Sequence, residues 1–226
     1  MKKAAGRTAL VAGATGLIGR RLLSVLADAG NYAAIHALLR RPADLPAPVI
    51  PQIVDFADLS LHAEAIGPLD DVYCALGTTI RKAGSQQAFR RVDHDHVLAV
   101  GQLAKQLGAR CMLVVSSLGA DSDARGFYLR VKGEAEADLE RLVLPGLAVF
   151  RPSLLQGPRD EFRLGEEVGN VAMKIFAPLV PNRYKPVSDR VLASAMLAVA
   201  QAGVSGVRVI ESEEIQRLGS GRSGSA

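Results

Sequence analysis

Residues Thr8–Arg20 read TALVAGATGLIGR, and this stretch decides how the rest of the chain is interpreted. It opens with an apolar run, Ala9–Ala12, that predicts a buried β-strand. Gly13, Gly16 and Gly19 follow at three-residue spacing, and apolar residues then recur at helical spacing. A strand, a glycine turn and a helix in this order are typical of a dinucleotide-binding βαβ unit, although three glycines alone would also fit an ordinary βα loop.

Each of the three glycines has a separate physical task in such a unit. Gly13 permits a tight turn after the strand, Gly16 lets the backbone approach a diphosphate, and Gly19 lets the helix pack close to the sheet. The first turn of the helix then offers free N–H groups and a positive dipole end to an anionic ligand. The sequence therefore predicts a phosphate-binding turn at residues 13–19.

The composition fits one globular domain. The chain has 226 residues, of which 49% are hydrophobic and 22% charged, enough for a single sizeable core. We expect one NAD(P)-binding domain over residues 1–216 and a flexible Gly/Ser-rich tail over 217–226. The net charge of +4 is spread along the chain and no basic run is interleaved with aromatic residues, so a nucleic-acid-binding surface is not expected.

The cysteines, the histidines and the hydropathy of the chain exclude several classes of protein. Cys74 and Cys111 both lie in apolar runs predicted to be buried strands, and they form neither a disulfide framework nor a metal-ligand pattern. His94 and His96 have no ligand partner at a suitable spacing, so no metal site is expected. No apolar stretch reaches membrane-spanning length, and the glycines interrupt the apolar segment that might mimic a secretion signal. These observations predict a cytoplasmic protein without a membrane partner.

Strand and helix patterns alternate along the rest of the chain. We expect further strands at 34–39, 50–54, 71–77, 111–115, 146–150 and 207–210, and helices at 59–66, 86–91, 94–107, 128–142, 165–176 and 188–202. This alternation is typical of an α/β protein with a doubly wound parallel sheet, the Rossmann fold. Residues 156–187 would form a small substrate-side region near the C-terminus.

Two arginines follow the second predicted strand. NAD-specific folds place an acidic residue here to bind the ribose 2′-hydroxyl, whereas Arg40 and Arg41 present guanidinium groups suited to a 2′-phosphate. They favour NADP(H) as the cofactor, the alternative being a solvated Arg-Arg loop. Asp55 and Phe56 end the third predicted strand and are expected to flank the adenine.

Polar residues follow two of the later strands, at the edge of the sheet where ligands bind in such folds. The loop Gly77–Thr79 would lie beside the sugar and phosphates, unless it is a plain turn. Ser116 and Ser117 follow the fifth strand, where a hydroxyl can hold a substrate oxygen.

Tyr128 and Lys132 are four residues apart on a predicted helix and therefore share a face. A neighbouring ammonium favours the phenolate form of a tyrosine, which makes Tyr128 a candidate proton donor or acceptor near neutral pH. Lys132 could also bind the nicotinamide ribose. The alternative is a surface Tyr-Lys pair with no chemical role.

These motifs resemble the short-chain dehydrogenase/reductase superfamily in its atypical branch, and above all the Tat-interacting-protein type of oxidoreductase. The resemblance runs from about residue 8 to 160. The motifs that carry it are the turn 13–19, Arg40-Arg41, 54–56, 76–79, 91–93, Ser116-Ser117 with 119–121, the segment 128–134 and 150–152.

The resemblance implies a set of site residues for NADP(H). The turn would bind through Gly13, Thr15, Gly16, Leu17, Ile18 and Gly19. The remaining contacts would come from Arg40, Arg41, Asp55, Leu76, Gly77, Tyr128, Lys132, Leu155 and Arg163. The catalytic set would be Ser117, Tyr128 and Lys132, since the superfamily pattern favours Ser117, although the residues alone leave Ser116 and Ser117 both open.

Three hypotheses of function follow from these residues. The first is an NADP(H)-dependent oxidoreductase acting on a carbonyl or alcohol. The second is a non-enzymatic NADPH-binding regulator, for which the serine, tyrosine and lysine would be unnecessary. The third is an NAD(P)-dependent epimerase or dehydratase, although the short chain after Pro158 leaves little room for the larger substrate domain of those enzymes. The sequence identifies neither the small-molecule substrate, nor a protein partner, nor an oligomeric state.

Overall fold

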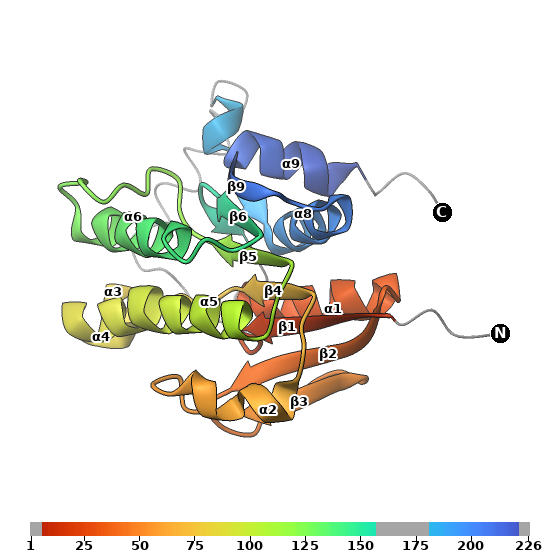
Figure 1. Ribbon diagram of the computed structural model, residues 1–226. Coiled ribbons are helices and arrows are strands. Elements are labelled where there is room, and N and C mark those ends of the chain that lie inside the picture. Colours follow the sequence, from red (N-terminus) through yellow and green to blue (C-terminus); the bar gives the residue numbers. More distant parts are fainter. Residues whose placement is uncertain (1–5, 157–180, 222–226) are drawn as a thin grey trace.

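A seven-stranded parallel sheet forms the centre of the computed structural model (Figure 1). The structure describes residues 6–156 and 181–221. The strand order is β3-β2-β1-β4-β5-β6-β9. The strands are β1 (Arg7–Ala12), β2 (Tyr32–Leu39), β3 (Val49–Ile53), β4 (Asp71–Cys74), β5 (Cys111–Val115), β6 (Gly146–Arg151) and β9 (Gly206–Glu211).

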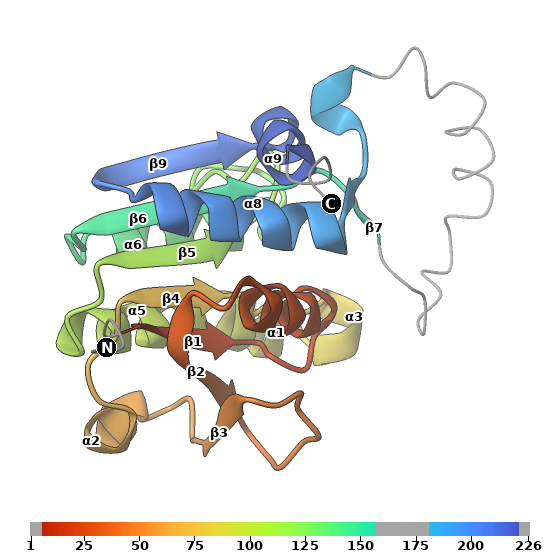
Figure 2. The same cartoon turned by 90° about the vertical axis from the view of Figure 1, so that its right-hand side faces the viewer.

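Helices cover both faces of this sheet, as Figures 1 and 2 show together. One face packs against α1 (Leu17–Ala29), α8 (Asp189–Ala202) and α9 (Ser212–Ser220). The other packs against α2 (Ala63–Ile66), α5 (His96–Gln106) and α6 (Phe127–Glu140). Because strand side chains alternate, Ala9 and Val11 enter the first core while Leu10 and Ala12 enter the second. Burial on both faces explains why the strands read as unbroken apolar runs.

The order of the strands places a ligand crevice at one edge of the sheet. From β1 the chain winds outward through β2 to β3, and then returns to the other side of β1 to continue from β4 to β9. The connections after β1 and β4 therefore diverge, which leaves a crevice outside the carboxyl ends of these neighbouring strands. The predicted doubly wound parallel sheet is confirmed.

Several elements differ from the sequence-based expectation. The two helices expected at 86–91 and 94–107 form one continuous helical run, in which a π-helical segment, η2 (Arg91–Asp95), joins α4 (Gln86–Arg90) to α5. The helix expected at 59–66 consists of a 3-10 turn, η1 (Leu59–His62), followed by α2. The structure adds the short helices α3 (Ile80–Ala83) and η4 (Asn182–Tyr184). It also adds a two-stranded sheet of β7 (Leu155–Gln156) and β8 (Val187–Ser188). The helix predicted at 165–176 lies outside the described residues.

The prediction of a flexible tail from residue 217 is wrong for its first four residues. They belong to α9, which continues to Ser220. Ile215 is fully buried, and Gly219 approaches the backbone of α8 so closely that an added Cβ would lie 2.1 Å from the Val191 carbonyl oxygen. Packing against α8 therefore stabilises a segment whose Gly/Ser-rich composition had suggested disorder.

Both cysteines lie where the apolar runs predicted, fully enclosed in strands. Burial raises the pKa of Cys74 to about 11 and that of Cys111 to about 12, so both are neutral thiols that act as small apolar side chains. Among the helices of the described ranges, none combines the length and the apolar character needed to cross a bilayer.

Two glycines bring β1, α1 and β4 unusually close together. Gly13 has a φ of 83°, in the left-handed region, and an added Cβ there would lie 2.5 Å from the Ala75 carbonyl oxygen. An added Cβ at Gly19 would lie 2.0 Å from the Gly13 carbonyl oxygen. The sheet and the first helix can meet at this point only if neither residue carries a side chain.

We therefore expect Gly19→Ala to destabilise the protein by about 1–3 kcal/mol through overpacking. The direction of this change in the free energy of unfolding is informative, because alanine in a helix interior is otherwise favoured over glycine by about 1 kcal/mol. Gly16→Ala is the matched control, since its Cβ would meet a single backbone atom at 3.3 Å. Urea unfolding of both variants measures the difference, and a Gly19→Ala protein as stable as the wild type would contradict the close packing.

Candidate functional site

The glycine turn exposes backbone at the crevice. Gly16 N–H donates to the Gly13 carbonyl oxygen at 3.0 Å, and α1 begins directly after Gly16, which has no side chain to cap the helix. Thr15, Gly16 and Leu17 are exposed, whereas Ile18 is buried in the core. The turn thus presents uncapped N–H groups to solvent, as an anion-binding helix terminus requires, while Ile18 could take part only through its backbone.

Positive charge gathers at the carboxyl end of β2. Arg40 and Arg41 are exposed, and within the described ranges neither forms a hydrogen bond or an ion pair. His96, on α5, stacks against Phe56 with ring centroids 5.3 Å apart. Burial lowers the pKa of His96, and the charges of Arg40 and Arg91 lower it further, which places both arginines near its ring.

His96 and Arg91 therefore belong to the same corner as the predicted arginine pair, although sequence reasoning missed both. His96 was interpreted as a structural or surface residue, and nothing in its spacing indicates that α5 turns it toward Phe56. Asp55, next to Phe56, is exposed and accepts a hydrogen bond from the Ala57 N–H at 2.9 Å. Phe56 is buried, so the corner combines the half-buried ring of His96 with unpaired guanidinium groups.

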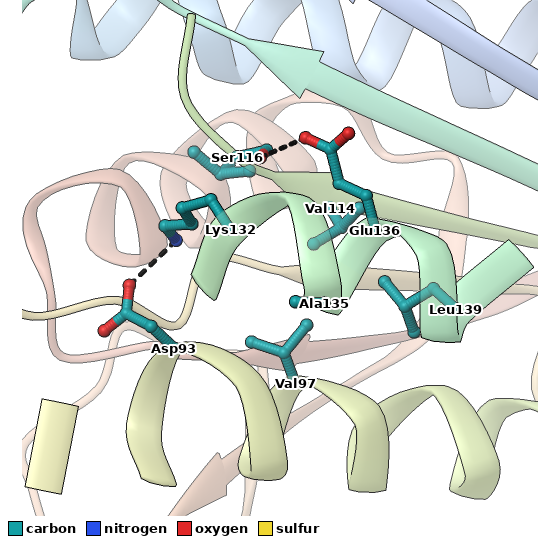
Figure 3. Close-up of a pocket in the computed structure, with 9 residues that line it drawn as sticks. Asp93, Val97, Val114, Ser116, Lys132, Ala135, Glu136 and Leu139 are labelled. Carbon is teal, nitrogen blue, oxygen red and sulfur yellow. Dashed lines mark hydrogen bonds and ion pairs between the residues drawn. The ribbon is translucent and has the colours of Figure 1, made fainter. Parts of the chain in front are cut away.

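Asp93 joins three segments beneath the crevice, and it too was missed as a site residue. One carboxylate oxygen accepts a hydrogen bond from the Thr78 N–H at 2.8 Å, and the other lies 2.8 Å from Lys132 Nζ (Figure 3). Its side chain is 1% exposed and that of Lys132 is 6% exposed. The π-helical segment η2 carries Asp93, consistent with the frequent occurrence of π-bulges at functional sites.

Gly77 lies against this ion pair, since an added Cβ would sit 3.4 Å from Asp93 Oδ1 and 3.8 Å from Lys132 Nζ. Leu76 is half-buried beside it and Gly77 is exposed. The loop after β4 is therefore fixed in place by the Thr78 hydrogen bond while it keeps an open face at the crevice.

Tyr128 and Lys132 share a face of α6 but differ sharply in exposure. Tyr128 is 37% exposed and packs on Phe89 with ring centroids 5.5 Å apart, whereas Lys132 is 5% exposed. Burial lowers the pKa of Lys132, but the negative charge of Asp93 together with the smaller effects of Tyr128 and Cys74 leaves the pKa raised. The lysine is therefore a charged ammonium inside the protein.

The structure distinguishes the two serines at the end of β5. Ser116 is buried, and its hydroxyl donates to the carboxylate of Glu136, which is also paired with the guanidinium of Arg151. Ser117 is half-buried and forms no side-chain hydrogen bond in the described part of the chain. Ser116 is thus committed to an internal network, whereas the Ser117 hydroxyl is available to a ligand.

A small pocket lies between the Asp93–Lys132 ion pair and the hydrogen bond of Ser116 to Glu136 (Figure 3). It lies between α5, α6 and β5, with Asp93 and Lys132 at one end and Ser116 and Glu136 at the other. Its volume is about 10 Å³, close to that of a single water molecule. It belongs to the floor of the crevice and is too small for a substrate.

The loop after β5 rests directly on α6. An added Cβ at Gly133 would lie 2.1 Å from the Asp121 carbonyl carbon, and the Asp121 N–H donates to the Leu129 carbonyl oxygen at 3.2 Å. The contact falls beside Lys132, so the loop that follows Ser117 is held against the helix that carries Tyr128.

The remaining predicted contacts lie toward the C-terminal region. Leu155 is half-buried in β7, where it pairs with Val187 of β8. Arg163 lies outside the described residues.

Comparison with known proteins identifies the family. A family of NAD(P)H-binding proteins matches residues 13–174, which include the turn, Asp93, Tyr128 and Lys132. This chain belongs to the NAD(P)H-binding family. Protein HTATIP2 of Rattus norvegicus is 37% identical over 181 residues, covering 78% of this chain and 73% of its own. The resemblance to the Tat-interacting-protein type is thereby confirmed.

A second relative spans almost the whole chain. Protein FMP52 of Eremothecium gossypii is 33% identical over 217 residues, covering 93% of this chain and 96% of its own. It and its Saccharomyces cerevisiae counterpart, 30% identical, are named as mitochondrial proteins. The prediction of a cytoplasmic location is wrong on this comparison. Composition and hydropathy report burial and solubility, and they do not encode a compartment.

Solved structures support the fold. MoeE5 in complex with UDP-glucose and NAD has a TM-score of 0.69 and 16% identity, covering 96% of this chain and 82% of its own. UDP-glucose 4-epimerase from Thermotoga maritima has a TM-score of 0.69 and 15% identity, covering 90% of this chain and 76% of its own. At such identities the likeness shows the Rossmann fold alone.

The buried ion pair generates a prediction about stability. Lys132→Met should destabilise the protein by about 3–5 kcal/mol, because it leaves Asp93 as an uncompensated charge in the interior. Adding Asp93→Asn to that variant should recover most of the loss, since the amide oxygen can still accept from the Thr78 N–H. Denaturant unfolding of both variants measures the effect, and a double variant less stable than Lys132→Met alone would refute the pairing.

Proposed function

We propose that this protein is an NADP(H)-dependent oxidoreductase of the short-chain dehydrogenase/reductase type, acting on a carbonyl or alcohol. One observation carries the proposal: an accessible phenol, Tyr128, lies one helical turn from a buried ammonium, Lys132. A surface Tyr-Lys pair without a chemical role would leave the lysine in water, because burying an ammonium is costly unless it is paired.

The described residues fit a dinucleotide. The backbone from Thr15 to Leu17 is exposed at an uncapped helix terminus, where an added side chain at Gly16 would occupy the approach of the diphosphate. The half-buried ring of His96, which packs on the buried ring of Phe56, provides an aromatic surface for the adenine. When bound, the nicotinamide of the cofactor supplies or accepts a hydride.

The chain's own residues handle the proton and the substrate oxygen. In the direction of reduction, the Tyr128 hydroxyl donates its proton to the carbonyl oxygen as the carbon receives the hydride; in oxidation Tyr128 takes the proton back. The Ser117 hydroxyl holds the same oxygen. Lys132 uses one of its three N–H donors for Asp93 and has others for a ribose hydroxyl. Leu155 and Arg163 remain predicted contacts.

The preference for NADP(H) is supported by the charged corner beside β2. Arg40 and Arg41 have no partner in the described part of the chain, and Arg91 and His96 lie near Arg40. Guanidinium groups left without carboxylates are suited to a phosphate dianion, which they can bind through paired N–H donors.

Replacing both arginines, Arg40→Ala with Arg41→Ala, should weaken NADPH binding by about 1.5–3 kcal/mol for each charged hydrogen bond lost. Binding of NADH should change little, since that cofactor has no 2′-phosphate. Calorimetric titration of each cofactor measures the effect, with Arg217→Ala, an exposed arginine of α9 that pairs with Glu214, as a control. Equal affinity of the wild-type protein for NADPH and NADH would end the proposed preference.

The second prediction concerns the proton donor. Tyr128→Phe keeps the ring that packs on Phe89 and removes only the hydroxyl, so NADPH affinity should hold while turnover falls by roughly 10²–10⁴. Turnover is followed by the loss of nicotinamide absorbance with a panel of aldehydes, ketones and quinones. Tyr32→Phe, at the opposite edge of the sheet, is the matched control and should keep the wild-type rate.

Two outcomes of the same assay would overturn these assignments. A Tyr128→Phe protein that reduces its substrate at the wild-type rate would exclude Tyr128 as the proton donor. A wild-type protein that binds NADPH and reduces nothing in the panel would favour the regulator over the oxidoreductase.

A further inference from the structure

The ion pair of Asp93 and Lys132 is the most enclosed one in residues 6–156 and 181–221. Both side chains are less than 10% exposed, whereas every other pair in those ranges has a partner that reaches solvent to a greater degree. Because both charges are enclosed by protein, they act on neighbouring groups with little screening by water or salt.

A paired lysine acts differently from an unpaired one. An isolated ammonium close to a phenol favours the phenolate and so releases the phenolic proton at lower pH. Asp93 places an opposite charge 2.8 Å from the same ammonium, so the two together exert only a dipolar field on Tyr128. The lysine keeps its hydrogen-bond donors, but most of its charge is offset.

We propose that Asp93 is a positioning residue that fixes Lys132 under the nicotinamide site and offsets the charge that Lys132 exerts on the Tyr128 hydroxyl. This role rests on the proposed function for its chemical consequence. The offset of the Lys132 charge by Asp93 can be tested without any substrate.

The other charged groups around this face are themselves neutral or compensated. From β4, the Cys74 thiol is neutral because burial raises its pKa to about 11. Across the small pocket, Glu136 is paired with Arg151 and accepts from the Ser116 hydroxyl.

The remaining neighbours lie on the helices around Tyr128. From α4, Phe89 packs on the ring, and Arg90 is paired with Glu134 of α6. Arg130 of α6 turns away, over Phe127, and donates to the Ala124 carbonyl oxygen. Asp93 is therefore the group that offsets the Lys132 charge.

The test is a spectrophotometric titration of the full-length protein, following the ultraviolet absorbance of tyrosinate. Burial raises the pKa of Tyr32 and of Tyr73, so neither contributes tyrosinate absorbance below strongly alkaline pH. Each protein is compared with its Tyr128→Phe twin, and the difference isolates Tyr128.

Two variants decide the proposal. Asp93→Asn with Lys132→Arg leaves a buried cation that keeps its proton but has no counter-charge, and should shift the Tyr128 signal about one to three pH units lower. Asp93→Asn with Lys132→Met removes both charges and should titrate close to the wild type. An unshifted signal in the arginine variant, or a methionine variant that titrates well above the wild type, would overturn the proposed charge offset.

Asp138→Asn is the matched control. Asp138 also joins η2 to α6, by accepting a hydrogen bond from His94 Nε2 at 3.0 Å, but Lys132 is not among its partners. In the Asp138→Asn variant the Tyr128 signal should appear at the same pH as in the wild type. A shift equal to that of the arginine variant would mean that loosening the contact between η2 and α6 is enough to change the pH at which Tyr128 titrates. Failure of the titration would refute the role of Asp93 alone; failure of the carbonyl assay would refute the oxidoreductase alone.

Discussion

The carboxylate of Asp93 is the interaction on which the site depends. Its two oxygens hold the loop after β4 through Thr78 and the helix α6 through Lys132. Without it the ammonium would have no counter-charge in the interior, and the loop beside the glycine turn would lose its attachment to the helical layer. One enclosed side chain thus sets the relative position of segments that come from three separate parts of the chain.

The sequence predicted the fold well because the signals were local. The glycine spacing after Ala9–Ala12 reports a turn and a helix, and the unbroken apolar runs report strands buried on both faces. Helix α9 was missed because its apolar positions, Ile215 and Leu218, are few and lie beside glycine and serine. These residues stabilise the helix by packing against α8, and a local sequence pattern does not reveal such a long-range contact.

The candidate site was predictable only in part, for the same reason. Tyr128 and Lys132 are neighbours at helical spacing, so their common face could be deduced. Asp93 lies far from Lys132 in the sequence, and although residues 91–93 are among the motifs that carry the resemblance, nothing in that polar helical segment indicates a buried partner for the carboxylate. The choice between Ser116 and Ser117 likewise needed the position of Glu136, because neighbouring residues on an extended chain face opposite ways and the sequence does not say which way meets α6.

The contact of Gly133 with the loop after β5 has a consequence for the energetics of binding. Since that loop rests on the backbone of α6, the segment that follows Ser117 is held against the helix that carries Tyr128 without any ligand. Part of the conformational entropy cost of bringing these two segments together is then incurred during folding. A substrate that meets such a preorganised pair can use its binding energy to orient its own reacting carbon.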